Sequence, residues 1–428
     1  MEHGRIYYPE DRLPLSRLLP MGLQHVVAMF GATVLAPILM GFNPQVALFF
    51  SGVGTLIFLF VTRFKVPSYL GSSFAFIGPV LAVTLGEPAR IPYALCGIVG
   101  ASILYAAAAL WTLRRGSAWI DRLMPPVVTG TVVAIIGLNL SSSAVANALN
   151  ADFAVRTSGD LLRLGVAAAT FMTAAAVSIY ARGFLRLLPI LTGVLAGYSL
   201  AAAAGALDPA ALAAIRDAAW FGLPPFQSPK FSLDALLVIS PIFIVLVAEN
   251  KGHIEAISGF MKRDLNPHLG RAYLGDSIAT FVSAMGGGTP QTTYAENMGV
   301  MAITRVFSSW NFVVAACIAL LLGLCPKFGA VIQSIPAPVL GGVTLILYGL
   351  IALMGVRIWI DARVDFHSHR NLIVAGVSLI AATGLGVKGV TVGGVNIAGI
   401  AFGTILALIL NLILSLGGAE DRQDAKTS

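Results

Sequence analysis

The sequence predicts an all-α polytopic membrane protein, and three observations carry that prediction. Of the 428 residues, 57% are hydrophobic and 11% are charged, whereas a soluble domain carries about 25% charged residues. Apolar runs of about 20 residues, each long enough to cross a bilayer as a helix, recur from Leu19 to Leu416. The basic residues collect in alternate loops between those runs. Lipid is therefore the expected solvent.

Fourteen transmembrane segments are expected along the chain. They are placed at residues 20–41, 44–62, 67–86, 92–113, 123–145, 161–181, 184–206, 234–259, 271–286, 290–304, 308–326, 335–356, 371–387 and 391–416. The first run has no evident cleavage site, and Glu2, Glu10 and Asp11 lie among the bases before it. It is interpreted as a permanent span, not as a signal peptide.

The net charge of +7 is explained by topology. With these spans, 19 lysines and arginines fall in the loops on one side and 7 on the other, and Lys251 lies inside a span, which accounts for all 27. The positive-inside rule then places both termini in the cytoplasm. The basic balance does not indicate a nucleic-acid partner.

No enzyme or metal motif is present in the sequence. HExxH, GxSxG and the phosphate-binding GKS/T are absent, and the HSH of residues 367–369 has no further ligands nearby in the sequence. Cys96, Cys317 and Cys325 lie in or beside apolar runs and suggest neither a disulfide framework nor a metal site. We expect no enzyme, no metal and no cofactor.

An internal repeat links the two halves of the chain. PVVTGTVVAIIGL from Pro126 and PVLGGVTLILYGL from Pro338 align at an offset of 212 residues, with seven expected spans between them. An odd number of spans reverses the second copy, and such inverted repeats are a transporter architecture. The segments are then arranged as 7+7 inverted repeats, unless the match is a chance similarity of apolar sequences.

The third and tenth spans open on polar, glycine-rich sequence. They begin VPSYLGSSFAFIGP (66–79) and GGGTPQTTYAENMGV (286–300). Both patterns suit an extended backbone followed by a shortened helix, which is tolerated in a membrane only where protein or a water-filled cavity covers it. Interrupted spans at matching places in two halves predict a binding site near the midplane. The alternative is a pair of ordinary spans with polar caps at the membrane surface.

The eighth span, VLVAENKGHIEAISGF (245–260), holds four ionisable residues. Glu249 and His253 are four residues apart and share a helix face, whereas Lys251 and Glu255 share another and can neutralise each other. Charges inside a membrane are costly and usually line a functional cavity. We expect Glu249 to face a site, with His253 tuning its proton affinity, and Lys251–Glu255 to be a structural pair. The alternative is a structural ion cluster of all four.

Four further residues are weighed singly. His25, in the first span, is either a packing histidine or a support for the site. Asp276 is expected to be a structural acid and Arg305 an interfacial anchor. Tyr348, in the second repeat copy, is expected to pack, unless it faces the cavity.

Several motifs together resemble the nucleobase–cation symporter (nucleobase–ascorbate transporter) family, and within it bacterial uracil and pyrimidine permeases. They are QHVVAMFGATVLAPIL, SYLGSSFAFIGP, VAENKGH, MPPVVTG and GGGTPQTTYAENMGVMAITR. The resemblance covers Leu19 to Leu416. It implies fourteen spans in two inverted sevens, with short strands in segments 3 and 10, and commonly a homodimer. It also implies a core domain (20–113 and 234–326) and a gate domain (123–206 and 335–416) that move against each other.

The resemblance also implies roles for individual residues. Glu249 and Glu296 fall on the substrate carboxylates and Phe74 on the aromatic stacking position. Ala295 falls on the backbone donor and His253 on the histidine one turn after the first acid. Purine-transporting relatives typically have glutamine in place of Glu296, which favours a pyrimidine. The remaining candidates are Tyr294 for the substrate, and His25, Asn297 and Tyr348 as support.

The chemistry of uracil suits this set of residues. Its two N–H groups can donate to two carboxylates in charge-assisted bonds, and backbone N–H groups at half-helix starts can donate to its carbonyls. Two acids in a low dielectric cannot both stay charged at low cost, so one is expected to hold a proton. Glu249, adjusted by His253, is the candidate for that role, with Glu296 as its partner.

The expected function is therefore proton-coupled uptake of uracil or a related pyrimidine across the inner membrane of a bacterium by alternating access. The first alternative is a xanthine or broad-range nucleobase permease of the same fold. An anion transporter of related architecture is disfavoured because paired acids repel anions. A receptor or an intramembrane enzyme is the non-transport alternative.

Overall fold

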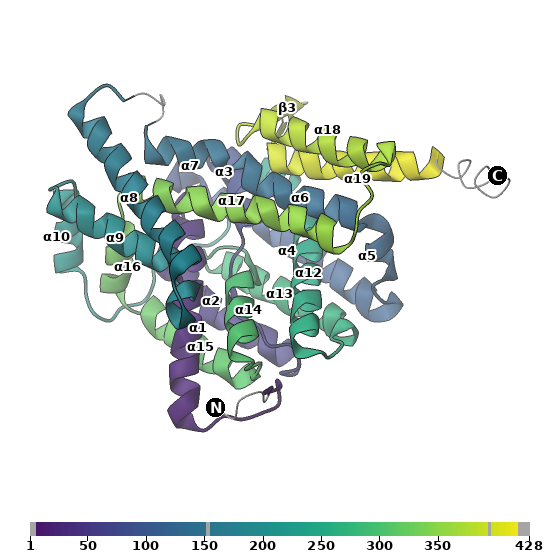
Figure 1. The fold of residues 1–428 in the computed structure, drawn as a ribbon, viewed down its shortest axis with the longest axis horizontal. Coiled ribbons are helices and arrows are strands. Elements are labelled where there is room, and N and C mark those ends of the chain that lie inside the picture. Colours follow the sequence, from purple (N-terminus) through teal and green to yellow (C-terminus); the bar gives the residue numbers. More distant parts are fainter. Residues whose placement is uncertain (1–5, 151–154, 393–394, 418–428) are drawn as a thin grey trace.

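The computed structural model describes residues 6–150, 155–392 and 395–417, and its ordered structure is mostly helical (Figure 1). The first half forms α1 (Leu15–Met40), α2 (Pro44–Val61), β1 (Leu70–Ser72), α3 (Ile77–Thr84), α4 (Ile91–Arg115), α5 (Ala118–Leu123), α6 (Pro126–Asn139), α7 (Ser141–Ala148), α8 (Ser158–Tyr180), α9 (Pro189–Ala203) and α10 (Pro209–Asp217). The second half forms α11 (Leu233–Ile239), α12 (Phe243–Met261), α13 (Leu269–Met285), β2 (Gln291–Thr293), α14 (Ala295–Thr304), α15 (Ser309–Gly323), α16 (Pro326–Gln333), α17 (Ala337–Asp361), α18 (His369–Leu385), β3 (Val390–Val392), β4 (Val395–Ile397) and α19 (Gly399–Gly417).

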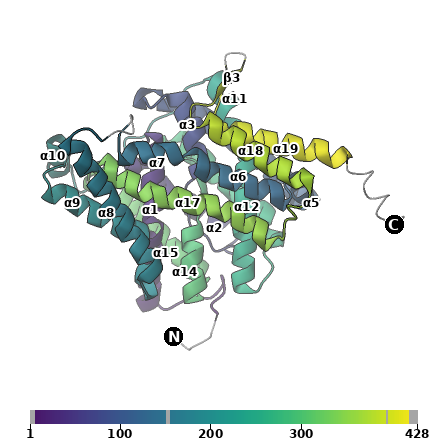
Figure 2. The same cartoon turned by 45° about the horizontal axis from the view of Figure 1, so that its top comes forward.

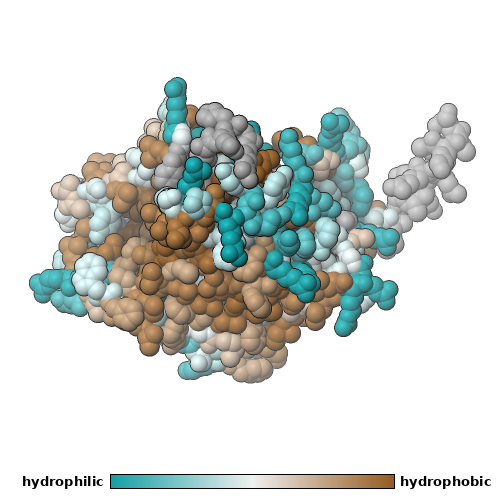
Figure 3. Space-filling model, turned by 90° about the horizontal axis from the view of Figure 1, so that it is seen from below, coloured by the Kyte–Doolittle hydropathy of each residue, from teal (hydrophilic) through white to brown (hydrophobic). Residues whose placement is uncertain are grey.

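Many of these helices suit a membrane. Within the described residues, seven helical stretches are long and apolar enough to cross a bilayer, and the bent pair α15–α16 makes an eighth. Four shorter apolar helices accompany them, at Phe74–Thr84, Pro189–Ala203, His369–Leu385 and Gly399–Ser415. A broad hydrophobic area covers much of the face in Figure 3, with hydrophilic atoms along its rim. The chain is a multi-pass membrane protein, as its composition predicts.

The turn from α1 to α2 shows how local sequence sets helix ends. Gly41 ends α1 with φ 81°, a left-handed conformation that glycine adopts without strain. Asn43 caps α2, because its side chain accepts hydrogen bonds from the backbone N–H groups of Gln45 (2.8 Å) and Val46 (3.4 Å). Pro44 occupies the first helical position, where its missing N–H is harmless. The sequence GFNP thus encodes a tight reversal between two spans.

The helices pack in two groups that each combine both halves of the chain (Figures 1 and 2). In the first group, α1, α2 and α4 pack against α11, α13 and α15. In the second group, α6, α7, α8 and α9 pack against α17, and α18 and α19 cover α6. The pairings within each group are more extensive than those between the groups.

The two copies of the repeat lie against each other in the second group. Gly130 of α6 is so close to Gly355 of α17 that a Cβ on either residue would clash with the partner backbone. Gly137 meets Tyr348 of α17 in the same way, further along α6. Because the residue numbers rise on α6 as they fall on α17, the two helices run antiparallel. Glycines at these places allow the close backbone approach.

Two pairs of short strands complete the fold. β1 pairs with β2 antiparallel, with Leu70 opposite Thr293 and Ser72 opposite Gln291. β3 pairs with β4 in a hairpin, with Val390 opposite Ile397. The expected span at 391–416 was therefore placed too early, since this hairpin precedes α19.

Two other expected spans differ from the observed helices in their ends. The segment expected at 308–326 ends as a straight helix at Gly323, and α16 turns away by 82°. Pro326 begins α16, in the position where proline starts a helix but cannot continue the preceding one. The segment expected at 123–145 forms one helical stretch, Pro126–Ala148, in which α6 meets α7 at Leu140.

Candidate functional site

The crossing of β1 and β2 brings two helix starts to one place. β1 leads into the 3-10 turn Phe74–Phe76 and then α3, whereas β2 leads into α14 at Ala295. The Tyr294 hydroxyl donates to the Ser72 carbonyl oxygen at 3.0 Å and ties the two segments together. A Cβ on Gly71 would lie 2.5 Å from the Tyr294 ring, so only glycine fits opposite this ring. Strands and half-helices meet here inside the first group of helices.

The site residues differ in burial from the strands beside them. Both strands are buried, as are eight of the 19 residues of α12. Five predicted residues, however, are only partly buried: Phe74, Glu249, His253, Ala295 and Glu296. These side chains are therefore less completely buried than the two strands beside them.

The two acids come from different elements. Glu249 lies on α12, and Glu296 lies in the first turn of α14, near enough for their charges to interact. Glu249 also lies near the hydroxyls of Ser73, which follows β1, and of Thr292, the middle residue of β2. Yet Oε2 of Glu249, Oγ of Ser73 and Oγ1 of Thr292 each have no partner at hydrogen-bond distance. This cluster can accept further hydrogen bonds through its carboxylates and donate through its hydroxyls.

His253 lies one helical turn beyond Glu249 and has a defined partner. Its Nδ1 lies 2.7 Å from the hydroxyl oxygen of Thr293 on β2. Two successive threonines of β2, Thr292 and Thr293, therefore contact successive turns of α12. The strand positions the ionisable face of that helix.

His25 and Asn297 contact each other, as their common assignment as support residues suggests. Nδ2 of Asn297 donates to Nδ1 of His25 and to its carbonyl oxygen, both at 3.1 Å. The His25 ring also packs on Phe312, with ring centroids 4.4 Å apart. Both residues are fully buried. The pair fastens the first turn of α14 to α1, directly behind Glu296.

Two predicted residues take other positions. Tyr294 is buried and uses its hydroxyl on Ser72, so it serves as a strut between the crossing segments. Tyr348 is also buried, and it lines a cavity of about 130 Å³ together with Gly137, Leu138 and other residues of α6, α7 and α17. None of the predicted substrate residues lines that cavity.

A buried polar network lies behind Glu249. Asn250 donates to both Asp276 of α13 and the Tyr105 hydroxyl of α4, the latter at 3.0 Å. Asp276 is fully buried and close enough to Glu249 for their charges to interact. The expectation that Asp276 is a bundle-buried acid is confirmed. Its network joins three helices at the depth of the site.

The expected ion pair of α12, Lys251 with Glu255, is confirmed as well. Lys251 Nζ lies 3.3 Å from the Glu255 carboxylate, four residues on, and Glu255 is the more exposed of the two. This pair occupies the face of α12 away from the site. Within the described residues, no group of three or more His, Cys, Asp or Glu side chains could hold a metal ion.

Sequence reasoning overlooked Ser73, Thr292, Thr293 and Asn250. The first three lie within the polar openings of the third and tenth spans, and Asn250 follows Glu249 directly. A polar residue next to a predicted site residue, inside a span, was the available signal. Their partners could not be read from it, because the contacts cross between elements distant in sequence.

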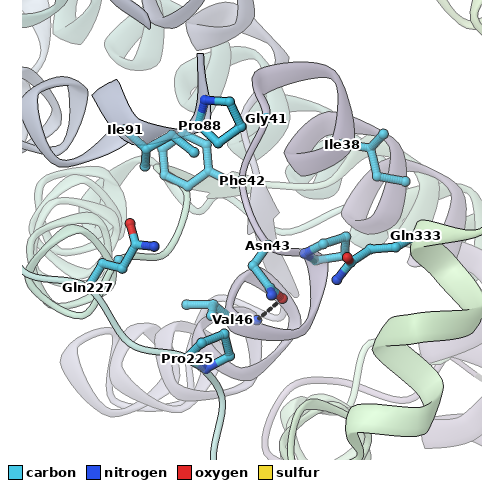
Figure 4. Close-up of a pocket in the computed structure, with 12 residues that line it drawn as sticks. Ile38, Gly41, Phe42, Asn43, Val46, Pro88, Ile91, Pro225, Gln227 and Gln333 are labelled. Carbon is cyan, nitrogen blue, oxygen red and sulfur yellow. Dashed lines mark hydrogen bonds between the residues drawn. The ribbon is translucent and has the colours of Figure 1, made fainter. Parts of the chain in front are cut away.

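A larger cavity of about 400 Å³ lies elsewhere (Figure 4). Its lining comes from the turn between α1 and α2, the start of α4, the loop before α11 and the end of α16, and none of the predicted substrate residues takes part. Asn43, Gln227 and Gln333 supply its polar atoms. The two crossing half-helices, not this cavity, hold the paired acids.

A bundle of apolar helices in which two interrupted spans meet and bring two acids together is typical of a membrane permease. The chain belongs to the Permease family, whose model matches residues 16–393. It is 45% identical over 419 residues to the putative pyrimidine permease RutG of Escherichia coli (strain K12), covering 95% of this chain and 91% of that protein. The uracil permeases of Escherichia coli (strain K12) and Bacillus caldolyticus are 41% and 42% identical, each over 95% of this chain and over 93% and 94% of their own lengths. The resemblance to uracil and pyrimidine permeases is confirmed.

Solved structures share the fold at low identity. The transmembrane domain of the cyanobacterial bicarbonate transporter BicA matches with a TM-score of 0.62 and 16% identity, over 95% of this chain and all of that one. The murine Slc26a9 anion transporter in its inward-facing state matches with a TM-score of 0.70 and 11% identity, over 95% of this chain and 70% of that one. The architecture is thus shared with transporters of other solutes.

Proposed function

We propose that this protein takes up uracil or a related pyrimidine nucleobase together with protons. The names of the uracil and pyrimidine permeases in its family support the solute class. The observation that carries the proposal is the pair Glu249 and Glu296, on two elements, bordering one partly open site. Paired acids suit a neutral solute with N–H donors and repel an anion.

Each group at the site has a complementary group on the ring. The carboxylates of Glu249 and Glu296 accept from the two N–H groups of uracil. The backbone N–H at Ala295 donates to its carbonyls, as do the hydroxyls of Ser73 and Thr292, which lie near Glu249 but have no hydrogen-bond partner among the described residues. The α14 dipole strengthens the donation at its first turn. Phe74 covers the ring face.

Coupling to protons follows from the closeness of the acids. Two carboxylates in a low dielectric cannot both remain charged at low cost, so one takes up a proton before a solute binds. We assign that proton to Glu249, with His253 as its relay and Thr293 fixing the imidazole orientation. Proton binding and solute binding are then linked at one site.

The two groups of helices are proposed to be two domains that move against each other. The core domain comprises 20–113 and 234–326, and the gate domain comprises 123–206 and 335–416. Fourteen segments in 7+7 inverted repeats, with both termini in the cytoplasm, place the site between domains that move against each other to give alternating access. Antiparallel packing of α6 on α17 supports the inversion. The working unit is proposed to be a homodimer in the bacterial inner membrane.

Uptake into proteoliposomes tests the function. With an inward proton gradient, labelled uracil should accumulate, and a protonophore should abolish the accumulation. Glu296→Gln removes a charged acceptor, a loss of about 1.5–3 kcal/mol or at least roughly tenfold in uracil affinity. Glu249→Gln removes the group that carries the proton, so uracil should no longer accumulate against a gradient. Glu255→Gln, on the same helix as Glu249 but in the other ion pair, is the matched control and should transport normally.

Two results would count against the proposal. Accumulation of uracil by Glu249→Gln against a gradient would exclude the coupling role of Glu249. Competition of uptake by xanthine as strongly as by uracil would favour the broad-range permease instead.

A further inference from the structure

A long irregular segment is held firmly across one end of the bundle. Residues 218–232, called the strap below, connect α10 to α11 without helix or strand. Backbone N–H groups of the strap donate to three helix ends: Gly222 to Leu324 at 3.0 Å, Gln227 to Gly286 at 3.2 Å and Lys230 to Pro92 at 2.8 Å. These partners lie at the ends of α15, α13 and α4. The strap therefore has a fixed course over the first group of helices.

The strap nevertheless exposes most of its large apolar side chains. Trp220, Phe221, Leu223 and Phe231 are 75%, 74%, 77% and 79% exposed. Phe226 is less exposed, at 45%, because it packs edge-on against the rings of Phe49 and Phe50, at centroid distances of 5.4 and 5.7 Å. A single exposed apolar residue is ordinary, but several in one short segment mark an interaction surface.

This surface continues into the apolar exterior of the spans. Leu321, one turn before the Leu324 carbonyl that holds the strap, is exposed on α15. At the other end, α11 begins directly after the strap, and its Leu233 and Leu237 are exposed as well. At both ends the strap thus joins surfaces that face lipid. α16, bent by 82° from α15, and α10, which packs on α16, extend the layer at this end (Figure 1).

Cationic side chains accompany the apolar ones. Lys327 Nζ lies 5.0 Å from the centroid of the Trp220 ring, and the Lys327 backbone N–H donates to Ala219 of the strap. Arg216 precedes the strap, paired with Asp217 at 3.2 Å, and Lys230 lies within it. Tryptophan with adjacent lysine is typical of the boundary between acyl chains and phospholipid headgroups, where the ring is half-buried and the cation meets phosphate.

We infer that the strap is an interfacial anchor, whose Trp220, Phe221, Leu223 and Phe231 insert into the headgroup–acyl boundary of the leaflet away from the N-terminus. A phospholipid surface fits better than water, because it removes four large apolar side chains from solvent. It also fits better than a second copy of the chain, because the exposed row is continuous with lipid-facing leucines and flanked by cations that match phosphate. The strap donates backbone hydrogen bonds to the ends of α4, α13 and α15, which all belong to the first group of helices, so the anchor fixes the depth of that group.

Emission from Trp220 tests the anchor in intact protein. The protein and its Trp220→Phe variant are placed in nanodiscs of phosphatidylcholine and phosphatidylglycerol, and the difference between their spectra isolates Trp220 while Trp111, Trp119, Trp310 and Trp359 stay unchanged. Lipids brominated near the headgroup should quench the difference emission more than lipids brominated at the chain end, and aqueous iodide should quench it least.

A matched control uses the opposite end of the bundle. Trp310 is partly buried between the Phe64 ring, 5.5 Å away, and the Arg12 guanidinium, 4.4 Å away. The corresponding Trp310→Phe difference should show little quenching by either lipid. Iodide quenching of Trp220 without bromolipid quenching would overturn the inference in favour of a solvated loop. If none of the three quenchers acted on Trp220, the inference of an interfacial anchor would be overturned, because protein would then cover this side chain.

Discussion

At the residue scale, the site is recognised by what its polar atoms lack. A buried polar atom without a partner costs about 1–3 kcal/mol, so such atoms are rare unless a ligand or water completes them. The described residues hold fifteen such side-chain atoms, and three of them lie together: Oε2 of Glu249, Oγ of Ser73 and Oγ1 of Thr292. They lie beside the partly exposed Phe74 and Glu296. A small polar solute would satisfy all three at once.

Thr292→Val tests this reading, because valine keeps the shape and removes the hydroxyl. Loss of one hydrogen bond of about 0.5–1.5 kcal/mol predicts a roughly two- to tenfold higher KM for uracil, with little change in thermal stability. Thr304→Val is the control, since that hydroxyl bonds only within its own helix and its loop. An unchanged KM in Thr292→Val would show that the hydroxyl does not touch the solute.

Thr293 acts through His253, and a pair of variants separates that role from packing. Thr293→Val removes the partner of Nδ1, whereas Thr293→Ser retains it. We expect Thr293→Val to lower proton-driven accumulation more than the exchange of labelled for unlabelled uracil, because exchange needs no net proton movement. Thr293→Ser should retain both. Equal loss of both activities in Thr293→Val would indicate a structural role instead.

The sequence predicts the two acids as site residues but does not predict the hydroxyl groups near them. Glu249 and His253 stand out because ionisable residues four apart in an apolar span share a face. Thr292 and Thr293 look like ordinary polar residues of an interrupted span. Their roles depend on how β2 lies against α12 and β1, which is a tertiary pairing that no local pattern encodes.

At the element scale, the strand crossing requires one glycine. Gly71 faces the Tyr294 ring, whose atoms would lie 2.5–2.6 Å from an added Cβ. Gly71→Ala must therefore displace the tyrosine, and overpacking of this kind costs about 1–3 kcal/mol. We expect a lower unfolding temperature in detergent and weaker uracil binding. Gly165→Ala, on α8 with no atom within 4 Å of its added Cβ, should be neutral or slightly stabilising.

A compensating variant sharpens that test. Gly71→Ala combined with Tyr294→Leu relieves the clash and should recover part of the lost stability, although the hydrogen bond to Ser72 is gone. If the double variant were no more stable than Gly71→Ala alone, the clash would not be the cause.

Element boundaries show where hydropathy fails as a guide. An apolar run does not reveal that α15 ends at Gly323 and α16 turns by 82°, although Pro326 marks a new helix start. The hairpin of β3 and β4 was likewise taken for the start of a span, because its valines and isoleucine are as apolar as those of a helix. The positions of proline and glycine in the sequence indicate these element boundaries better than hydropathy does.

At the scale of the whole molecule, fold and solute are separate questions. The bicarbonate transporter BicA and the Slc26a9 anion transporter share this architecture at 16% and 11% identity. One fold therefore supports transport of anions and, in the uracil permeases, of a nucleobase. The solute has to be inferred from the proposed site, whose two carboxylates would repel an anion.

The two packing groups must move against each other if access alternates, and a disulfide between them tests this. In Gly31→Cys/Ile190→Cys, the two residues come from α1 and α9, and a Cβ on Gly31 would lie 2.9 Å from that of Ile190. In the control Gly22→Cys/Val314→Cys, both come from the first group, with a Cβ separation of 2.7 Å. Both pairs are close enough for a disulfide after a small adjustment.

Both pairs are introduced after Cys96, Cys317 and Cys325 are replaced by alanine. We expect the oxidised α1–α9 link to abolish uptake and a reductant to restore it, because the link prevents one group from moving past the other. The oxidised α1–α15 link should leave most of the uptake intact, since those helices move as one body. Full transport through a protein quantitatively linked between α1 and α9 would mean that this contact persists through the whole cycle, and the division into core and gate would have to be redrawn.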